Sequence, residues 1–140
     1  MENFEFHENL VLESNHKSLD IVENLIEKVK DRYSISKDCY FNILVAITEA
    51  VNNAISHGNH FDENKFVKFE IFSNYKELEV MITDEGTGFD PNVLEDCTKE
   101  ENLMKDSGRG IFIIRALTKE FEIKSTEKGT FYRLLFNLSH

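Results

Sequence analysis

Three groups of polar and glycine residues have types and spacings that could bind a ligand. The first comprises Glu49, Asn53 and His57, which are spaced four residues apart in the run EAVNNAISHG. In a helix this spacing places the three side chains on one face. A carboxylate one turn from a carboxamide can accept a proton beside a metal ion, and Asn offers a neutral oxygen that suits Mg²⁺. The alternative is an ordinary solvent-exposed helix face, which is the commoner origin of such a stripe.

The second group is the run DEGTGF, in which Asp84 precedes Gly86 and Gly88 at the end of an apolar segment. The two glycines permit backbone conformations, and close approach to a planar ligand, that other residues resist. A fixed carboxylate here would attract the exocyclic amine of adenine and repel the carbonyl oxygen of guanine. The alternative is a glycine-rich turn. A calcium loop is excluded, because both glycines fall where such a loop needs oxygen-bearing side chains.

The third group is the run SGRGI, which consists of Ser107, Gly108, Arg109, Gly110 and Ile111. It lies at the expected start of a helix, where unpaired N–H groups and a partial positive charge favour an anion such as phosphate. The Lys-Ser/Thr pair of a Walker A loop is absent, and no strand followed by GxGxxG precedes the helix. The alternative is a flexible hinge before a core helix.

Hydrophobic periodicity predicts the elements that position these groups. Apolar residues alternate in strand segments and recur at helical spacing in helices, and Ser36 is the expected N-cap of a helix ending near Gly58. The expected order is a strand at 4–13, helices at 20–33 and 36–58, strands at 65–73 and 78–83, a connector at 90–107, a helix at 108–117, and strands at 120–124 and 132–138. This order predicts an α+β, two-layer α/β sandwich with a mixed or antiparallel sheet and helices on one face.

The composition is that of one domain spanning residues 1–140. The chain has 16 Lys and Arg against 26 Asp and Glu, a net charge of −10. Without a basic cluster, this acidity argues against nucleic-acid binding and against docking on an anionic membrane. The apolar runs are too short to span a bilayer, and the N-terminus is unlike a secretory signal. Two cysteines are too few for a disulfide framework, so we expect a cytoplasmic protein.

The order and spacing of the three groups resemble a known superfamily. The runs ExxxNA at 49–54, DxGxGF at 84–89 and GxG at 108–110 look like the N, G1 and G2 boxes of the ATPase superfamily of gyrase, Hsp90, histidine kinases and MutL. The resemblance covers about residues 36–136, and its expected fold is the histidine-kinase-like ATPase fold. Within that superfamily, EAVNNA and HG followed by DEGTGFDP resemble the short bacterial anti-sigma-factor serine kinases.

The resemblance implies a site for ATP and Mg²⁺. Asn53 would hold the metal ion and Glu49 would be the general base. Asp84 would bind adenine, in a pocket shaped by Gly86 and Gly88.

The remaining implied contacts lie further along the chain. The amides around Gly108–Ile111 would bind the phosphates, and Thr130 would support adenine recognition. Residues 90–107 would form a lid. Some of these kinases carry an arginine in the lid, whereas the nearest cations here are Lys105 and Arg109.

The resemblance further implies an ATP-dependent serine protein kinase that is also an anti-sigma factor. Its partners would be a sigma factor and an anti-anti-sigma protein of the STAS type, which is the phosphorylation substrate, and the kinase would be a homodimer. The alternative is a nucleotide-gated module that sequesters a partner without phosphotransfer. A sensor histidine kinase fragment has less support, because only 48 residues precede Glu49 and a strand and a helix use most of them.

Overall fold

The computed structural model describes residues 3–86 and 106–140. In this part of the chain the order of elements follows the predicted one. The elements are β1 (Phe6–Glu13), α1 (Lys17–Tyr33), α2 (Lys37–Asn53), the π-helical turn η1 (Ala54–Gly58), β2 (Phe66–Ser73), β3 (Glu77–Thr83), α5 (Asp106–Leu117), β4 (Glu120–Thr126) and β5 (Gly129–Asn137).

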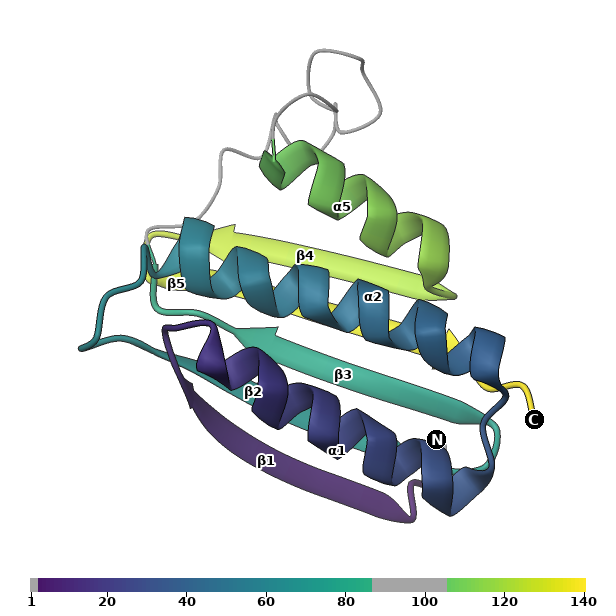
Figure 1. Cartoon of the computed structure of the whole chain (residues 1–140). Helices are drawn as coiled ribbons and strands as arrows, with labels where there is room; N and C mark the ends of the chain where they lie inside the picture. The colour runs from purple at the N-terminus through teal and green to yellow at the C-terminus, as the bar shows by residue number, and fades with distance from the viewer. Residues whose placement is uncertain (1–2, 87–105) are drawn as a thin grey trace.

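The described strands form one five-stranded sheet in the order β1-β2-β3-β5-β4 (Figure 1). Each neighbouring pair is antiparallel, so the antiparallel form of the predicted sheet is the correct one. The register places Phe69 opposite Ile82, Ile82 opposite Tyr132, and Tyr132 opposite Ile123. Because side chains alternate between the faces of a sheet, these residues form one row on the same face.

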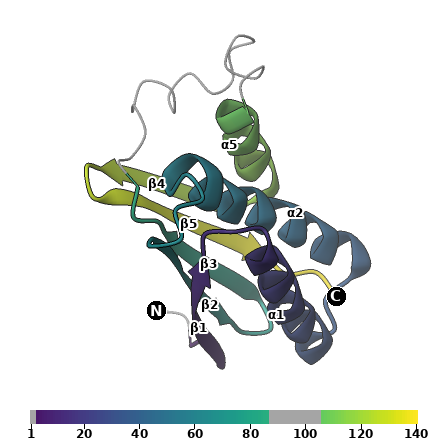
Figure 2. The ribbon, with the colours of Figure 1, turned by 60° about the vertical axis from the view of Figure 1, so that its left-hand side comes forward.

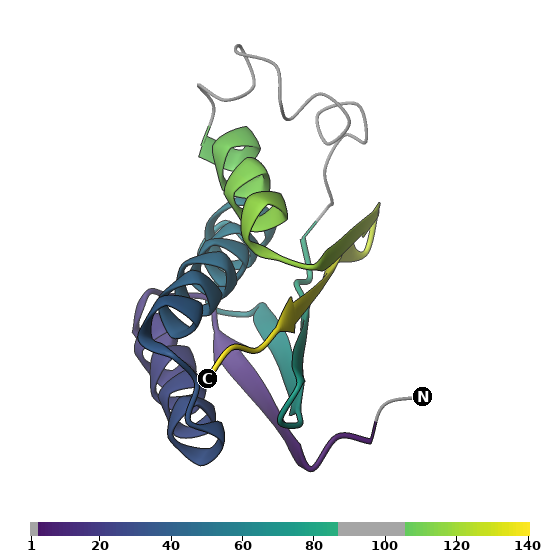
Figure 3. The same cartoon turned by 90° about the vertical axis from the view of Figure 1, so that its right-hand side faces the viewer.

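Within residues 3–86 and 106–140, helices α1, α2 and α5 cover that face and leave the other open, as the predicted two-layer sandwich requires (Figures 2 and 3). Helices α1 and α2 bury apolar residues at helical spacing, including Val22, Ile26 and Val29 in α1 and Ile43, Ile47 and Val51 in α2. These side chains form a single core with the inward residues of the sheet. Removal of this apolar surface from water is the main stabilising contribution to such a fold.

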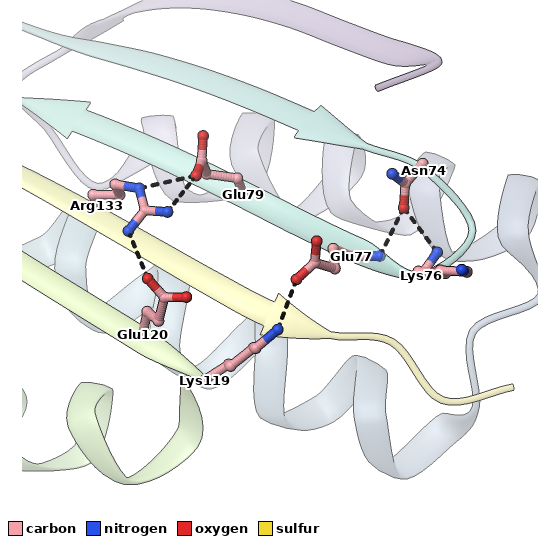
Figure 4. Close-up of polar contacts among 7 residues, drawn as sticks. All are labelled: Asn74, Lys76, Glu77, Glu79, Lys119, Glu120 and Arg133. Atoms are coloured by element: carbon pink, nitrogen blue, oxygen red, sulfur yellow. Dashed lines mark hydrogen bonds and ion pairs between the residues drawn. The ribbon is translucent and has the colours of Figure 1, made fainter. Parts of the chain in front are cut away.

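The open face of the sheet carries polar pairs that join β3, β4, β5 and Lys119, the residue before β4 (Figure 4). Arg133 on β5 donates through Nε to Glu79 Oε2 on β3 at 2.9 Å, and through Nη1 to Glu120 Oε1 on β4 at 3.4 Å. Lys119 Nζ donates to Glu77 Oε2 at 3.0 Å. The alternation of apolar inward and polar outward residues accounts for the strand signal in the sequence.

The helix boundaries agree with the prediction at one end of α2 and differ at the other. Ser36 Oγ accepts a hydrogen bond from the Cys39 N–H at 3.3 Å, which confirms the predicted N-cap. The helical segment ends at Gly58 as predicted, but its last turn is π-helical, since the Asn59 N–H donates to the Ala54 carbonyl at 2.8 Å. Hydrophobic spacing carries no signal for this wider turn.

Helix α5 begins at Asp106, two residues before the predicted start at Gly108. Asp106 and Ser107, the last two residues of the predicted lid at 90–107, belong to this helix. Residues 90–105 of that prediction lie outside the described residues. Among the helices that the structure describes, none combines the length and hydropathy needed to cross a bilayer.

Candidate functional site

Helix α2 supplies Glu49 and Asn53 to a pocket near its C-terminal end. Asn53 is buried, at 2% exposure, and within residues 3–86 and 106–140 its Nδ2 atom has no hydrogen-bond partner. Glu49 is half-buried. The interpretation as a solvent-exposed helix face is therefore wrong for Asn53. Its carboxamide is shielded from water, and among the described residues its Nδ2 donor lacks the acceptor that a buried donor usually has.

Helix α5 brings its glycine-rich first turns against these two side chains. A Cβ atom built on Gly110 would lie 3.1 Å from both Asn53 Nδ2 and Glu49 Oε2. The missing side chain thus lets the backbone of α5 approach α2 closely. A pocket of about 440 Å³ opens at this junction, and its lining includes Glu49, Asn53, His57, Arg109 and Gly110. The first and third groups of the sequence are therefore brought together.

Asp84, which directly follows β3, is a buried carboxylate with one hydrogen-bonded oxygen. Its Oδ1 accepts hydrogen bonds from the Gly86 N–H at 3.0 Å and the Thr130 N–H at 2.9 Å. In the described part of the chain, Oδ2 has no partner, and the residue is 1% exposed. Burial raises the pKa of Asp84, because desolvation outweighs the two backbone hydrogen bonds that favour the charged form.

Three glycines give the Asp84 carboxyl group and its backbone room to sit here. A Cβ on Gly58 would overlap Asp84 Oδ2, and one on Gly86 would overlap the carbonyl of Gly58. Gly129 has φ +146°, and its Cβ would overlap the backbone oxygen of Asp84. Gly58 and Gly129 were not among the predicted site residues. The sequence signals for them are the HG pair that ends η1 and the turn before Thr130.

Strand β5 adds Thr130 and Tyr132 beside Asp84. Thr130 is fully buried, and its Oγ1 lies 2.9 Å from Ser125 Oγ on β4. Tyr132 is also fully buried, and no described residue pairs with its hydroxyl. Burial raises the pKa of Tyr132 well above its usual value, and the nearby Asp84 carboxylate raises it further. No motif or spacing in the sequence indicates that Ser125 or Tyr132 lies near the site.

The other predicted site residues are placed less completely. Gly88 lies outside the described residues, as does Lys105. Ser107 and Gly108 belong to the first turn of α5, and Arg109 follows them with an exposed side chain. The side chain of Ile111 is buried in the core at 1% exposure.

The comparison with known families matches this architecture. Residues 12–136 match the family described as "Histidine kinase-like ATPase domain". The chain belongs to this family. This match confirms the predicted superfamily and the predicted ATPase fold. A histidine kinase-like ATPase domain uses ATP.

This ATPase domain is similar to curated serine-protein kinases. It is 26% identical over 137 residues to "Serine-protein kinase RsbW" of Bacillus thuringiensis. The aligned region covers 93% of this chain and 84% of that protein. It is 25% identical over 133 residues to the RsbW of Oceanobacillus iheyensis, covering 89% and 82% of the two chains. These names agree with the prediction of a bacterial serine protein kinase.

A solved structure supports the same fold for this ATPase domain. The crystal structure of the RsbU and RsbW domains of a Mycobacterium tuberculosis protein superposes with a TM-score of 0.66 at 18% identity. The superposition covers 96% of this chain and 33% of that chain. The shared arrangement of helices on one face of an antiparallel sheet thus persists at low sequence identity.

Proposed function

We propose that this chain is an ATP-dependent serine protein kinase and anti-sigma factor, which binds Mg-ATP and phosphorylates an anti-anti-sigma partner of the STAS type. One observation carries the proposal. The end of α2 joins two sites, the buried carboxylate of Asp84 beside Gly58 and the pocket lined by Glu49 and Asn53. The names of the RsbW relatives support the kinase activity.

Asp84 is suited to recognise adenine. Its Oδ1 already accepts two backbone hydrogen bonds, whereas its Oδ2 lacks a donor among residues 3–86 and 106–140. An exocyclic amine would supply that donor, and a buried acceptor gains most from such a bond because leaving it unpaired is costly. Guanine would instead direct a carbonyl oxygen toward the carboxylate. We therefore expect ATP to bind more tightly than GTP.

The pocket between α2 and α5 is suited to phosphates and Mg²⁺. Asn53 supplies a buried carboxamide one turn from the Glu49 carboxylate, and Mg²⁺ combines few such oxygen ligands with waters and phosphate oxygens. The first turns of α5, with Gly108 and Gly110, direct backbone N–H groups and a partial positive charge toward an anion. Bound Mg²⁺ would neutralise charge on the phosphates.

Glu49 is the proposed general base of the transfer. As the serine oxygen bonds to the γ-phosphorus and the bond to the ADP oxygen breaks, Glu49 would accept the hydroxyl proton. Its Oε2 lies close to Gly110, in the part of α5 that we propose binds the phosphates. Arg109 lines the same pocket and would offset charge on the transferred group.

The proposed partners and setting follow from the resemblance to anti-sigma-factor kinases. They are a sigma factor that the protein would hold inactive, a STAS-type protein that it would phosphorylate, and a second copy in a homodimer. The proposed location is the cytoplasm. Gly88 in the base pocket and a lid at about 90–107 also remain proposals.

The first experiment is calorimetric titration of the wild type with ATP and with GTP, each with and without Mg²⁺. We expect Mg-dependent ATP binding and much weaker GTP binding. Asp84→Asn should lose ATP binding, because it replaces the acceptor Oδ2 with a donor or a neutral oxygen. A wild type that binds neither nucleotide would refute the proposed function.

A second experiment separates kinase from sequestering module. Radiolabelled γ-phosphate transfer to a STAS-domain protein of the same bacterium is measured for the wild type and for Glu49→Gln, which keeps the side-chain size. We expect at least about a hundredfold loss of transfer with ATP affinity retained, as for removal of a general base. Partner binding without transfer by the wild type would support the alternative of a nucleotide-gated module.

A further inference from the structure

Asn59, which directly follows the π-helical turn η1, is a buried residue outside the three motifs. It is 1% exposed. Its Nδ2 donates to Ser14 Oγ at 3.0 Å and to the Phe66 carbonyl at 3.1 Å. Its Oδ1 accepts from the Glu85 N–H at 2.8 Å. Both donors and the acceptor of the carboxamide are therefore in use.

These bonds join segments on both sides of the Asp84 carboxylate. Gly58, the residue before Asn59, is the glycine whose Cβ would overlap Asp84 Oδ2. Glu85, which bonds to Asn59, is the residue directly after Asp84. Asn59 thus links the helix end that lies against the carboxylate to the backbone that carries it.

The Glu85 contact matters because β3 has already ended at Thr83. Beyond that point, the Asp84 N–H donates to the Thr130 carbonyl at 3.0 Å on the side of β5. On the side of η1 and β2, the segment is held by the Asn59 bond to Glu85 N–H and by Glu85 Oε2, which accepts from the Phe66 N–H. Loss of the Asn59 acceptor would free one side of this short segment and leave a backbone donor without its buried partner.

We propose that Asn59 is a positioning residue for nucleotide-base recognition. It fixes the separation between η1 and the Asp84–Gly86 segment, and so it sets the orientation of the carboxylate that faces the base. This inference rests on the proposed function, in which Asp84 binds adenine. Asn59 itself does not touch the base in this arrangement; it acts through Glu85 and Gly58. Its effect should therefore fall on base selectivity rather than on phosphate binding.

The test compares Asn59→Ala with Ser14→Ala. Ser14→Ala removes one acceptor of Asn59 Nδ2 and leaves the bond to Glu85 intact, so it serves as a control for lost stability in the same cluster. ATP and GTP affinities are measured by calorimetry at a temperature where both variants are folded. Amide hydrogen exchange at Glu85 is measured in parallel, because it reports the proposed contact directly.

We expect Asn59→Ala to lower the ratio of ATP to GTP affinity about tenfold and to speed exchange of the Glu85 amide, while Ser14→Ala leaves both near the wild-type values. If Asn59→Ala does not fold, Asn59→Ser, whose side chain is too short to reach Glu85, replaces it. An unchanged affinity ratio in the Asn59 variant would overturn the positioning role while leaving the proposed function intact. A wild type without nucleotide binding would overturn both.

Discussion

Gly58 lies so close to the Asp84 carboxylate that a Cβ atom at residue 58 would overlap Asp84 Oδ2. The contact joins the end of the α2–η1 segment to the end of β3. Asn53, five residues before Gly58, lines the pocket between α2 and α5. One helix end therefore contributes to both the proposed base site and the proposed phosphate site, and its last turn sets the distance between them.

Gly58→Ala should lower both stability and ATP affinity. The added methyl group meets a buried carboxylate that is held by Gly86 and Thr130, so it can be accommodated only if η1 or Asp84 moves. Overpacking of this kind costs about 1–3 kcal/mol. Thermal unfolding and calorimetric ATP binding measure the two effects.

Ala54→Gly is the matched control for Gly58→Ala. It loosens the start of the same turn and removes a buried methyl group, but it adds no atom near Asp84. We expect it to lower the melting temperature without a matching loss of ATP affinity. Wild-type ATP affinity in Gly58→Ala would show that the contact with Asp84 has no part in binding.

Gly110→Ala should weaken ATP binding without loss of stability. Alanine favours a helix interior over glycine by about 1 kcal/mol. The new methyl would meet the ends of the Asn53 and Glu49 side chains at 3.1 Å, and these can shift by a few tenths of an ångström. The melting temperature should therefore stay the same or rise, while the space between α2 and α5 narrows.

Calorimetry and thermal unfolding of Gly110→Ala check both halves of this prediction. Phe112→Ala is the control, because it introduces alanine at an exposed position of the same helix. It should leave ATP affinity unchanged. A marked loss of stability in Gly110→Ala, with unaltered ATP affinity, would contradict the proposed role of the close approach.

The elements of this fold were predictable because each depends on local spacing. Alternating apolar residues in β2 and β3 and helical spacing in α1 and α2 follow from one buried face per element. Ser36 was predictable as an N-cap for the same local reason. The pairing of β5 between β3 and β4 was not, because strand order depends on contacts between segments far apart in the sequence.

The features of the candidate site likewise divide into those that local spacing predicts and those that depend on distant contacts. Four-residue spacing predicted that Glu49 and Asn53 share a helix face, and they do so at one pocket. Periodicity could not predict the contact between Gly58 and Asp84. This contact depends on the π-helical turn η1 and on the packing of the end of β3 against that turn. The burial of Tyr132 near Asp84 likewise depends on the register between β3 and β5.

Asp84→Asn should stabilise the nucleotide-free protein at neutral pH. Burial raises the pKa of Asp84 above its ordinary value of 3.8, so the folded state holds this proton to higher pH than the unfolded state does. The stability associated with the protonated form is complete below the ordinary pKa and is lost as pH rises through the raised pKa. Asparagine is neutral throughout and avoids that loss.

The measurement is the free energy of unfolding by urea at several pH values between about 4 and 8. The advantage of Asp84→Asn over the wild type should be largest at the alkaline end and shrink toward pH 4. Glu127→Gln, at an exposed position in the turn between β4 and β5, controls for the loss of one negative charge. A wild type more stable than Asp84→Asn at pH 8 would contradict the desolvation of this carboxylate.

Tyr132→Phe should raise the stability of the nucleotide-free protein, whereas Tyr33→Phe should lower it. Both tyrosines are buried, but Tyr33 Oη donates to the Ser73 carbonyl at 3.3 Å, while Tyr132 Oη has no partner in the described part of the chain. An unpaired buried hydroxyl costs about 1–3 kcal/mol, and a paired one contributes about 1 kcal/mol. Phenylalanine keeps the ring in place in both variants. Urea unfolding without nucleotide should therefore give shifts of opposite sign, and a loss of stability in Tyr132→Phe equal to that of Tyr33→Phe would mean that the Tyr132 hydroxyl is hydrogen-bonded in solution.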